Sequence, residues 1–158
     1  MYIEKYWEKY IGGSDDSMTL LDYLADKQKE EIPFNEIFSD SGLDKLDSFR
    51  KTDVELSLSV EGFDAEIHYA IDLLTDIAAL LLECKINGSV NLGELSDMYE
   101  PDSIIQIMAT QEEHVMINKV LKDFVDEPFS YDLIEMMSEE EMREMAEVCK
   151  ELREELYG

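Results

Sequence analysis

Basic residues are scarce in this chain. Thirteen Lys and Arg residues stand against 39 Asp and Glu residues, so the 158 residues carry a formal net charge of −26. A nucleic-acid binder needs Lys and Arg to neutralise phosphates, and an anionic membrane surface attracts the same residues. We therefore expect neither nucleic acid nor a membrane as partner. Hydrophobic residues still make up 45% of the chain, which indicates a folded domain rather than a disordered acidic tail.

Cysteines and long apolar runs are scarce as well. Cys84 and Cys149 are the only cysteines, and each lies in an apolar helical pattern, so buried free thiols are expected rather than a disulfide. The longest apolar run, residues 77–82, is too short to span a bilayer. The first residues show neither the basic nor the apolar region of a secretory signal. These features predict a cytoplasmic protein with a single domain over 1–158.

Recognisable catalytic and metal-binding motifs are missing too. His68 and His114 are the only histidines, and neither belongs to the His-Glu-x-x-His pattern of a metalloprotease helix. Residues 12–14 lack the Lys of a phosphate-binding loop, and residues 39–42 form only a turn, not a calcium loop. We therefore predict that the protein is not an enzyme and uses no cofactor and no metal.

Alternating apolar and polar residues predict a small antiparallel sheet. Residues 54–60 and 63–69 each alternate with a period of two, and Glu61-Gly62 between them suits a tight turn. A further strand is expected near 103–109, where Ile105 and Ile107 alternate with polar residues. With the helices described next, this gives an α+β fold in which the sheet packs against several helices.

Helical periodicity covers much of the rest of the chain. Residues 71–85 are apolar over most of the helical circumference, which predicts the central buried helix. Capping boxes at 110–113 and 138–141 predict the starts of two more helices, the second being a long C-terminal helix. The other expected helices cover residues 3–11, a segment following the Ser14–Ser17 caps, a short segment beginning at Pro33, and a short segment within 89–102.

An apolar stripe on the C-terminal helix has two interpretations. Its residues step by three and four, as in a narrow helical seam; they are Met142, Met145, Cys149, Leu152 and Leu156. The stripe packs on the central helix, or it forms an interface between chains. Met136 and Met137 likewise either fill the core or form an adaptable contact surface. The sequence leaves the oligomeric state open, with a monomer as the expectation.

Three long windows contain acids but no base. They lie between Lys51 and Lys85, between Lys85 and Lys119, and between Lys122 and Arg143. The negative potential should be deepest in such windows, because exposed charges are screened beyond about 8 Å at physiological salt. The candidate partner-binding residues are Asp64, Glu66, Asp97, Glu100 and Asp102. The alternative is that these acids form a merely solvated face.

Three stretches, residues 6–24, 70–84 and 131–138, resemble immunity proteins of bacterial polymorphic and contact-dependent toxin systems. The similarity extends over most of the chain, but its motifs are not catalytic signatures. The resemblance implies a cytosolic immunity-protein-like domain over 1–158 that binds and neutralises the C-terminal domain of one cognate toxin.

The acidic composition agrees with that implication. Toxins of this class are often nucleases with basic clefts, and an acidic inhibitor is steered toward such a cleft. We therefore expect a basic, nuclease-type toxin as the partner. Two alternatives remain at this stage: an acidic regulatory or nucleic-acid-mimicking protein that binds a basic host protein, and a small enzyme or metal-binding protein without a recognisable motif.

Overall fold

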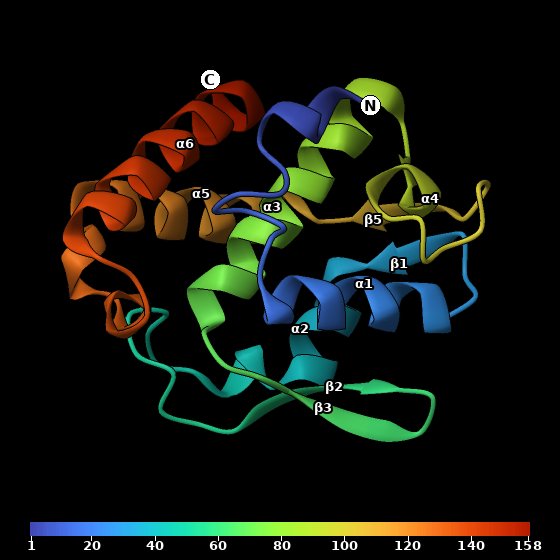
Figure 1. The fold of residues 1–158 in the computed structure, drawn as a ribbon, viewed down its shortest axis with the longest axis horizontal. Coiled ribbons are helices and arrows are strands. Elements are labelled where there is room, and N and C mark those ends of the chain that lie inside the picture. Colours follow the sequence, from blue (N-terminus) through green and yellow to red (C-terminus); the bar gives the residue numbers. More distant parts are fainter.

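The computed structural model describes residues 1–158. Helix α3 (Ala70–Asn87) runs through the middle of the molecule, and the other elements surround it (Figure 1). On one side of α3, α5 (Gln111–Asp126) packs against α6 (Glu139–Tyr157); α1 (Asp15–Asp26) lies on the other (Figure 1). The remaining helical elements are α2 (Phe34–Ser41), α4 (Leu92–Leu95) and 3-10 turns at Tyr2–Lys5, Leu43–Lys45, Pro128–Ser130 and Asp132–Glu135. The α+β fold class is confirmed.

The predicted helix caps are present. Thr110 and Ser138 each accept a hydrogen bond from the backbone amide three residues on, and the glutamate there returns the bond. Ser14 and Ser17 form the same reciprocal arrangement at the start of α1. Each pair satisfies two backbone donors that have no partner within the helix. These local signals explain why the helix starts were predictable.

The strands form two sheets rather than one. The predicted hairpin pairs β2 (Leu56–Val60) with β3 (Phe63–Ile67), and both turn residues between them have positive φ, 50° and 85°. The predicted strand near 103–109 is β5 (Ile104–Met108), but it does not join the hairpin. It pairs in parallel with β1 (Glu31–Pro33) and antiparallel with β4 (Val90–Asn91). The expectation of one antiparallel sheet was therefore wrong.

The expected helix over residues 3–11 was wrong as well. Only a 3-10 turn forms, and Glu8 then adopts a positive φ of 97°, which breaks the helix. The chain doubles back so that Gly12 covers the ring of Trp7, where a Cβ would lie only 2.1 Å from a ring carbon. The apolar side chains Ile3, Trp7 and Ile11 are nevertheless buried. The spacing of these apolar residues therefore predicted their burial correctly, but not a helix. Gly12 lets the chain turn back more sharply than a helix would.

Three buried acids connect α3 to the N-terminal third of the chain. Asp76 accepts hydrogen bonds from the Gly12 amide at 2.8 Å and the Ser17 hydroxyl at 2.6 Å. Glu83 accepts one from the Ile3 amide at 3.0 Å. Asp16 of α1 accepts bonds from the amides of His68 and Tyr69, just before α3 begins. Buried carboxylates are tolerated when donors surround them, so these acids hold the segments in place.

The C-terminal seam belongs to the core of this chain. Met142, Met145, Cys149, Leu152 and Leu156 are all buried, and α6 contacts both α3 and α5. Both cysteines are free, as expected, although Cys84 is only half-buried. None of the helices combines the length and the apolar character needed to cross a membrane.

Truncation of core residues on α3 should be strongly destabilising. Leu74 and Ile77 are fully buried and Leu81 nearly so. Each change to Ala should lower the free energy of unfolding by about 2–5 kcal/mol, because it removes apolar contacts and leaves a cavity. Urea denaturation measures the change. The control is Val115→Ala at an exposed position of α5; losses below about 1 kcal/mol at all three core positions would show that α3 is peripheral.

Asp72 gives a stability prediction that depends on pH. Burial raises the pKa of its carboxyl from 3.8 to about 6, so the folded state holds a proton that the unfolded chain releases. Stability therefore falls as the pH rises from about 4 to about 6. Its place in the first turn of α3 favours the anion by only about 0.3–1 kcal/mol. Asp72→Asn should stabilise the fold by about 1–3 kcal/mol at pH 8 and much less at pH 4.

Urea denaturation of the variant and wild type at both pH values measures this difference. The control is Asp97→Asn at an exposed site, which should change stability little at either pH. A destabilising effect of Asp72→Asn at pH 8 would contradict the prediction.

Candidate functional site

An open groove of about 1430 Å³ lies between the C-terminal end of α1 and the segment that joins α4 to β5. Its walls also include the residues that lead into β1. Six carboxylates line the groove: Glu30, Glu31, Glu94, Asp97, Glu100 and Asp102. Most of them are contributed by exposed loop positions around the small mixed sheet.

The groove has little positive charge to balance these acids. Lys29 is the only base in its lining, and its ammonium lies 3.0 Å from Glu36 on α2. The N-terminal ammonium reaches Glu94 at 4.0 Å. No Lys or Arg ion pair involves Asp97, Glu100 or Asp102. Charges of one sign that line a concave surface focus the electrostatic potential there, so the groove attracts cations.

The α4–β5 segment is held tightly against the fold. Asn91 caps α4 by accepting a hydrogen bond from the Gly93 amide at 3.0 Å. The Leu92 amide donates to the Ser103 carbonyl at 2.9 Å, which closes the base of the loop. At Gly93 the loop passes so close that a Cβ would lie 2.4 Å from the Glu100 carbonyl oxygen. Only glycine fits this position without a shift of the loop.

A tyrosine anchors the same loop to α1. The Tyr99 hydroxyl donates to Asp22 at 2.5 Å. Burial, and then this hydrogen bond, raise the pKa of Tyr99 above its usual value. The tyrosine therefore stays protonated and remains a donor. With this anchor and the Gly93 contact, the loop acids are presented on a fixed backbone.

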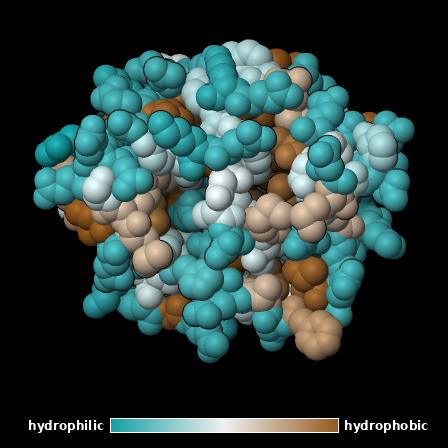
Figure 2. All heavy atoms as spheres, in the orientation of Figure 1, coloured by the Kyte–Doolittle hydropathy of each residue, from teal (hydrophilic) through white to brown (hydrophobic).

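Apolar side chains are exposed beside the acids. Met98 at the loop is 70% exposed, and Ile104 at the start of β5 is 49% exposed. Figure 2 shows small hydrophobic patches scattered over a largely hydrophilic face of the molecule. Polar surroundings with a few exposed apolar side chains are typical of protein–protein contact surfaces.

The structure brings together three of the five predicted binding residues. Asp97, Glu100 and Asp102 share the groove, whereas Asp64 and Glu66 lie on the exposed face of β3. The latter two border a separate depression next to the hairpin. The five predicted residues therefore lie on two separate acidic surfaces.

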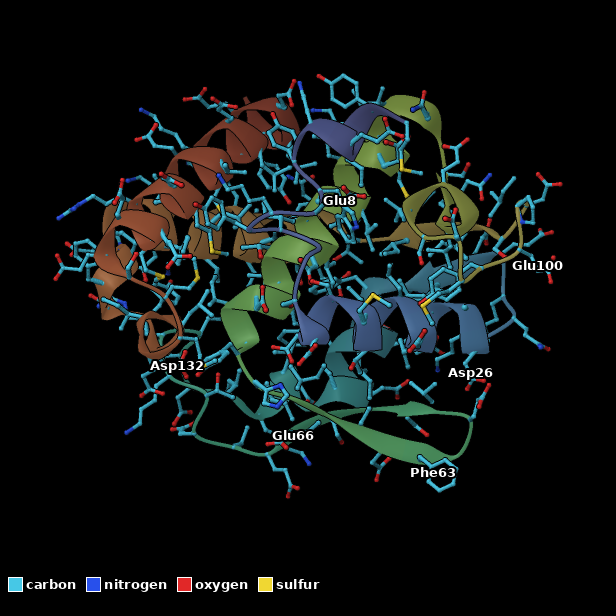
Figure 3. The ribbon with its side chains drawn as sticks, in the orientation of Figure 1. Glu8, Asp26, Phe63, Glu66, Glu100 and Asp132 are labelled. Atoms are coloured by element: carbon cyan, nitrogen blue, oxygen red, sulfur yellow. The ribbon has the colours of Figure 1, made fainter.

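One contact joins the hairpin to the end of α1 that borders the groove. The Glu61 amide in the hairpin turn donates to Asp26 at the end of α1, at 3.1 Å. Figure 3 shows Glu100, Asp26 and Phe63 along the same side of the molecule. Phe63 is 79% exposed at the start of β3. The hairpin therefore extends the side that carries the groove.

Sequence reasoning missed half of the groove. Glu30 and Glu31 lie far along the chain from 97–102, and Lys29 next to them masks them in a search for base-free windows. Glu94 lies in the same base-free window as 97–102 and was simply not selected. The parallel pairing of β1 with β5 brings Glu31 opposite Gln106. No local pattern predicts this pairing, because each strand is very short.

The histidines have structural partners. His68 lies 2.9 Å from the buried Asp16 carboxylate, whose hydrogen bond raises the pKa of the imidazole, and His114 lies 2.9 Å from the Tyr157 hydroxyl. No group of three His, Cys, Asp or Glu side chains has the geometry to hold a metal ion. The acidic groove is thus the most prominent feature of the surface.

The comparisons with known proteins give one match. A family model described as Immunity protein 68 matches residues 2–156. Neither the curated proteins nor the solved structures gave a match.

Gly93→Ala should loosen the groove. The added methyl must displace the Glu100 backbone, so we expect a loss of about 1–3 kcal/mol in the free energy of unfolding. Hydrogen exchange at the Leu92 amide should accelerate, because its bond to Ser103 closes the displaced loop. Glu94→Ala, one position later and exposed, is the control. Unchanged exchange and stability in Gly93→Ala would show that the loop accommodates the methyl freely.

Proposed function

Because this chain belongs to the immunity protein 68 family, we propose that it binds and neutralises a cognate bacterial toxin domain through the acidic groove. Membership of an immunity protein family implies an inhibitor rather than an enzyme. The observation that carries the proposed site is the gathering of six carboxylates in one groove whose only lysine is already paired. The partner that fits this groove is a basic protein surface.

Charge complementarity supports a nuclease-type toxin. Enzymes that act on nucleic acid hold phosphates with Lys and Arg, so their clefts are basic. An acidic inhibitor is steered toward such a cleft, and its association rate rises by roughly 10- to 1000-fold. Close charge pairs across the interface then couple by about 1.5–7 kcal/mol. Fast capture suits an inhibitor that must act before its toxin does.

Apolar contacts supply the other part of the binding free energy. Met98 and Ile104 lie among the groove acids, and Phe63 lies on the adjoining hairpin. Their burial against the toxin would remove apolar surface from water, at about 25 cal/mol per Å². Asp64 and Glu66 point to the opposite face of β3 from Phe63, so they would act on association through their charge rather than through this apolar contact. The groove and hairpin together form the proposed toxin-binding surface.

The rigid α4–β5 loop favours this function. Its acids need little ordering on binding, because Gly93 and Tyr99 already hold the loop in place. Preorganised side chains lose less conformational entropy, which raises affinity without any new contact.

Association kinetics with the cognate toxin domain test the proposal. Asp97→Lys combined with Asp102→Lys should slow association by about tenfold at low salt, and the wild-type rate constant should fall steeply as salt rises. The matched control reverses Glu151 and Glu154, which are exposed on α6 away from the groove. Stopped-flow or surface binding across salt concentrations gives the rate constants.

Two results would count against this account. An association rate constant that does not depend on salt would remove the electrostatic mechanism. Equal slowing by the groove pair and the α6 pair would retain steering but place the contact elsewhere than the groove. Unfolding temperatures of the variants confirm that the charge reversals leave the fold intact.

A further inference from the structure

A second pocket lies on another part of the molecule, between the N-terminal ends of α1 and α3 and the segment before α6. Figure 1 shows where these three parts of the chain lie. Its volume is about 460 Å³. Tyr10, Tyr69, Leu133, Met136 and Met137 contribute apolar or aromatic walls. None of the groove residues belongs to it.

Asp72 lies at this pocket and differs from the other buried acids. It is only 4% exposed, yet its single hydrogen bond beyond the helix ladder uses the backbone carbonyl, which accepts from Thr75. Asp16 and Asp76, by contrast, accept two or more hydrogen bonds each. The Ser14 hydroxyl is the one side-chain donor that lowers the pKa of Asp72, and its oxygen also takes part in the helix cap with Ser17.

The Asp72 oxygens therefore open onto the pocket. Fully sealed side-chain oxygens without a partner occur only at Glu36 and Asp132. A carboxylate that is largely removed from water without a donor is costly to the fold. A buried carboxylate with so few partners requires an explanation, and a bound ligand that supplies donors is one.

The surrounding charge favours a cation. Asp15, Asp16 and Glu141 line the pocket together with two bases, Lys9 and His68. The Lys9 ammonium lies 3.8 Å from Glu144, and His68 is paired with Asp16. Neither base forms an ion pair with Asp72. The acids lack the geometry of a metal site, and the methionine and tyrosine walls suit an alkyl chain.

We propose that this pocket binds one organic cation, an alkyl chain that ends in a guanidinium or an ammonium group, with the cationic end on Asp72. The alkyl part lies against Leu133, Met136 and Met137. The cation supplies donors to the Asp72 carboxylate beyond the Ser14 hydroxyl, and the flexible methionines adjust to the width of the chain. Such a group arrives either as a free small amine or as an Arg or Lys side chain of the toxin. Only the second source rests on the proposed toxin-binding function.

The first experiment uses a free probe. Backbone NMR of labelled protein is followed while n-butylguanidinium is added, with the neutral n-butylurea as the matched ligand control. We expect saturable shifts at His68, Tyr69 and Asp72 in the millimolar range, and little response to the urea. Asp72→Asn should weaken probe binding at least tenfold, whereas Asp97→Asn in the groove should leave it unchanged.

The second experiment identifies the source of the cation. If the toxin inserts a side chain, Asp72→Asn should weaken toxin binding at least tenfold although the variant folds more stably than wild type. If the probe binds through Asp72 but toxin affinity is unchanged, the ligand is a free small cation. Failure of wild type to bind toxin would remove the proposed function alone, and the probe titration would still decide the pocket. The pocket proposal is overturned if neither probe nor toxin binding depends on Asp72.

Discussion

The fold depends on one buried helix, α3, which must be surrounded by hydrogen-bond donors as well as by apolar side chains. Helix α3 buries 14 of its 18 residues, and these include Asp72, Asp76 and Glu83. Burial of an acid is costly unless hydrogen bonds replace water. The backbone amides of Ile3 and Gly12 supply them to Glu83 and Asp76, so the N-terminal segment must run across α3. The N-terminal segment takes an irregular path because its amides must reach the buried acids of α3.

Local signals in the sequence predicted the elements whose stabilising interactions are local. Capping boxes fixed the starts of α5 and α6, and the Glu61-Gly62 turn fixed the hairpin. The mixed sheet was not predictable in the same way, because β1 and β4 have only three and two residues and pair with a distant strand. A period cannot be read from so few residues, and their strand geometry comes from tertiary contacts.

The residues of the candidate sites also divide into those that local sequence predicts and those that only the fold brings together. Asp97, Glu100 and Asp102 were predictable as a group because they are neighbours in the sequence and share one base-free window. Their companions Glu30 and Glu31 enter the groove only through the pairing of β1 with β5. Asp72 was visible in the sequence only as a break in an apolar helix. Its shortage of hydrogen-bond donors is a property of the folded chain.

The few bases are placed where they join elements rather than where acids are most crowded. Lys27 links α1 to α2 through Asp40 at 2.9 Å, and Arg50 forms two hydrogen bonds with Asp123 of α5. Lys85 donates to two carbonyls at the C-terminal end of α6, where a cation is favourable. The groove acids are therefore left uncompensated, and the excess charge of −26 falls largely on the surface. A basic partner that binds only the folded state relieves this repulsion, so its binding stabilises the fold through mass action.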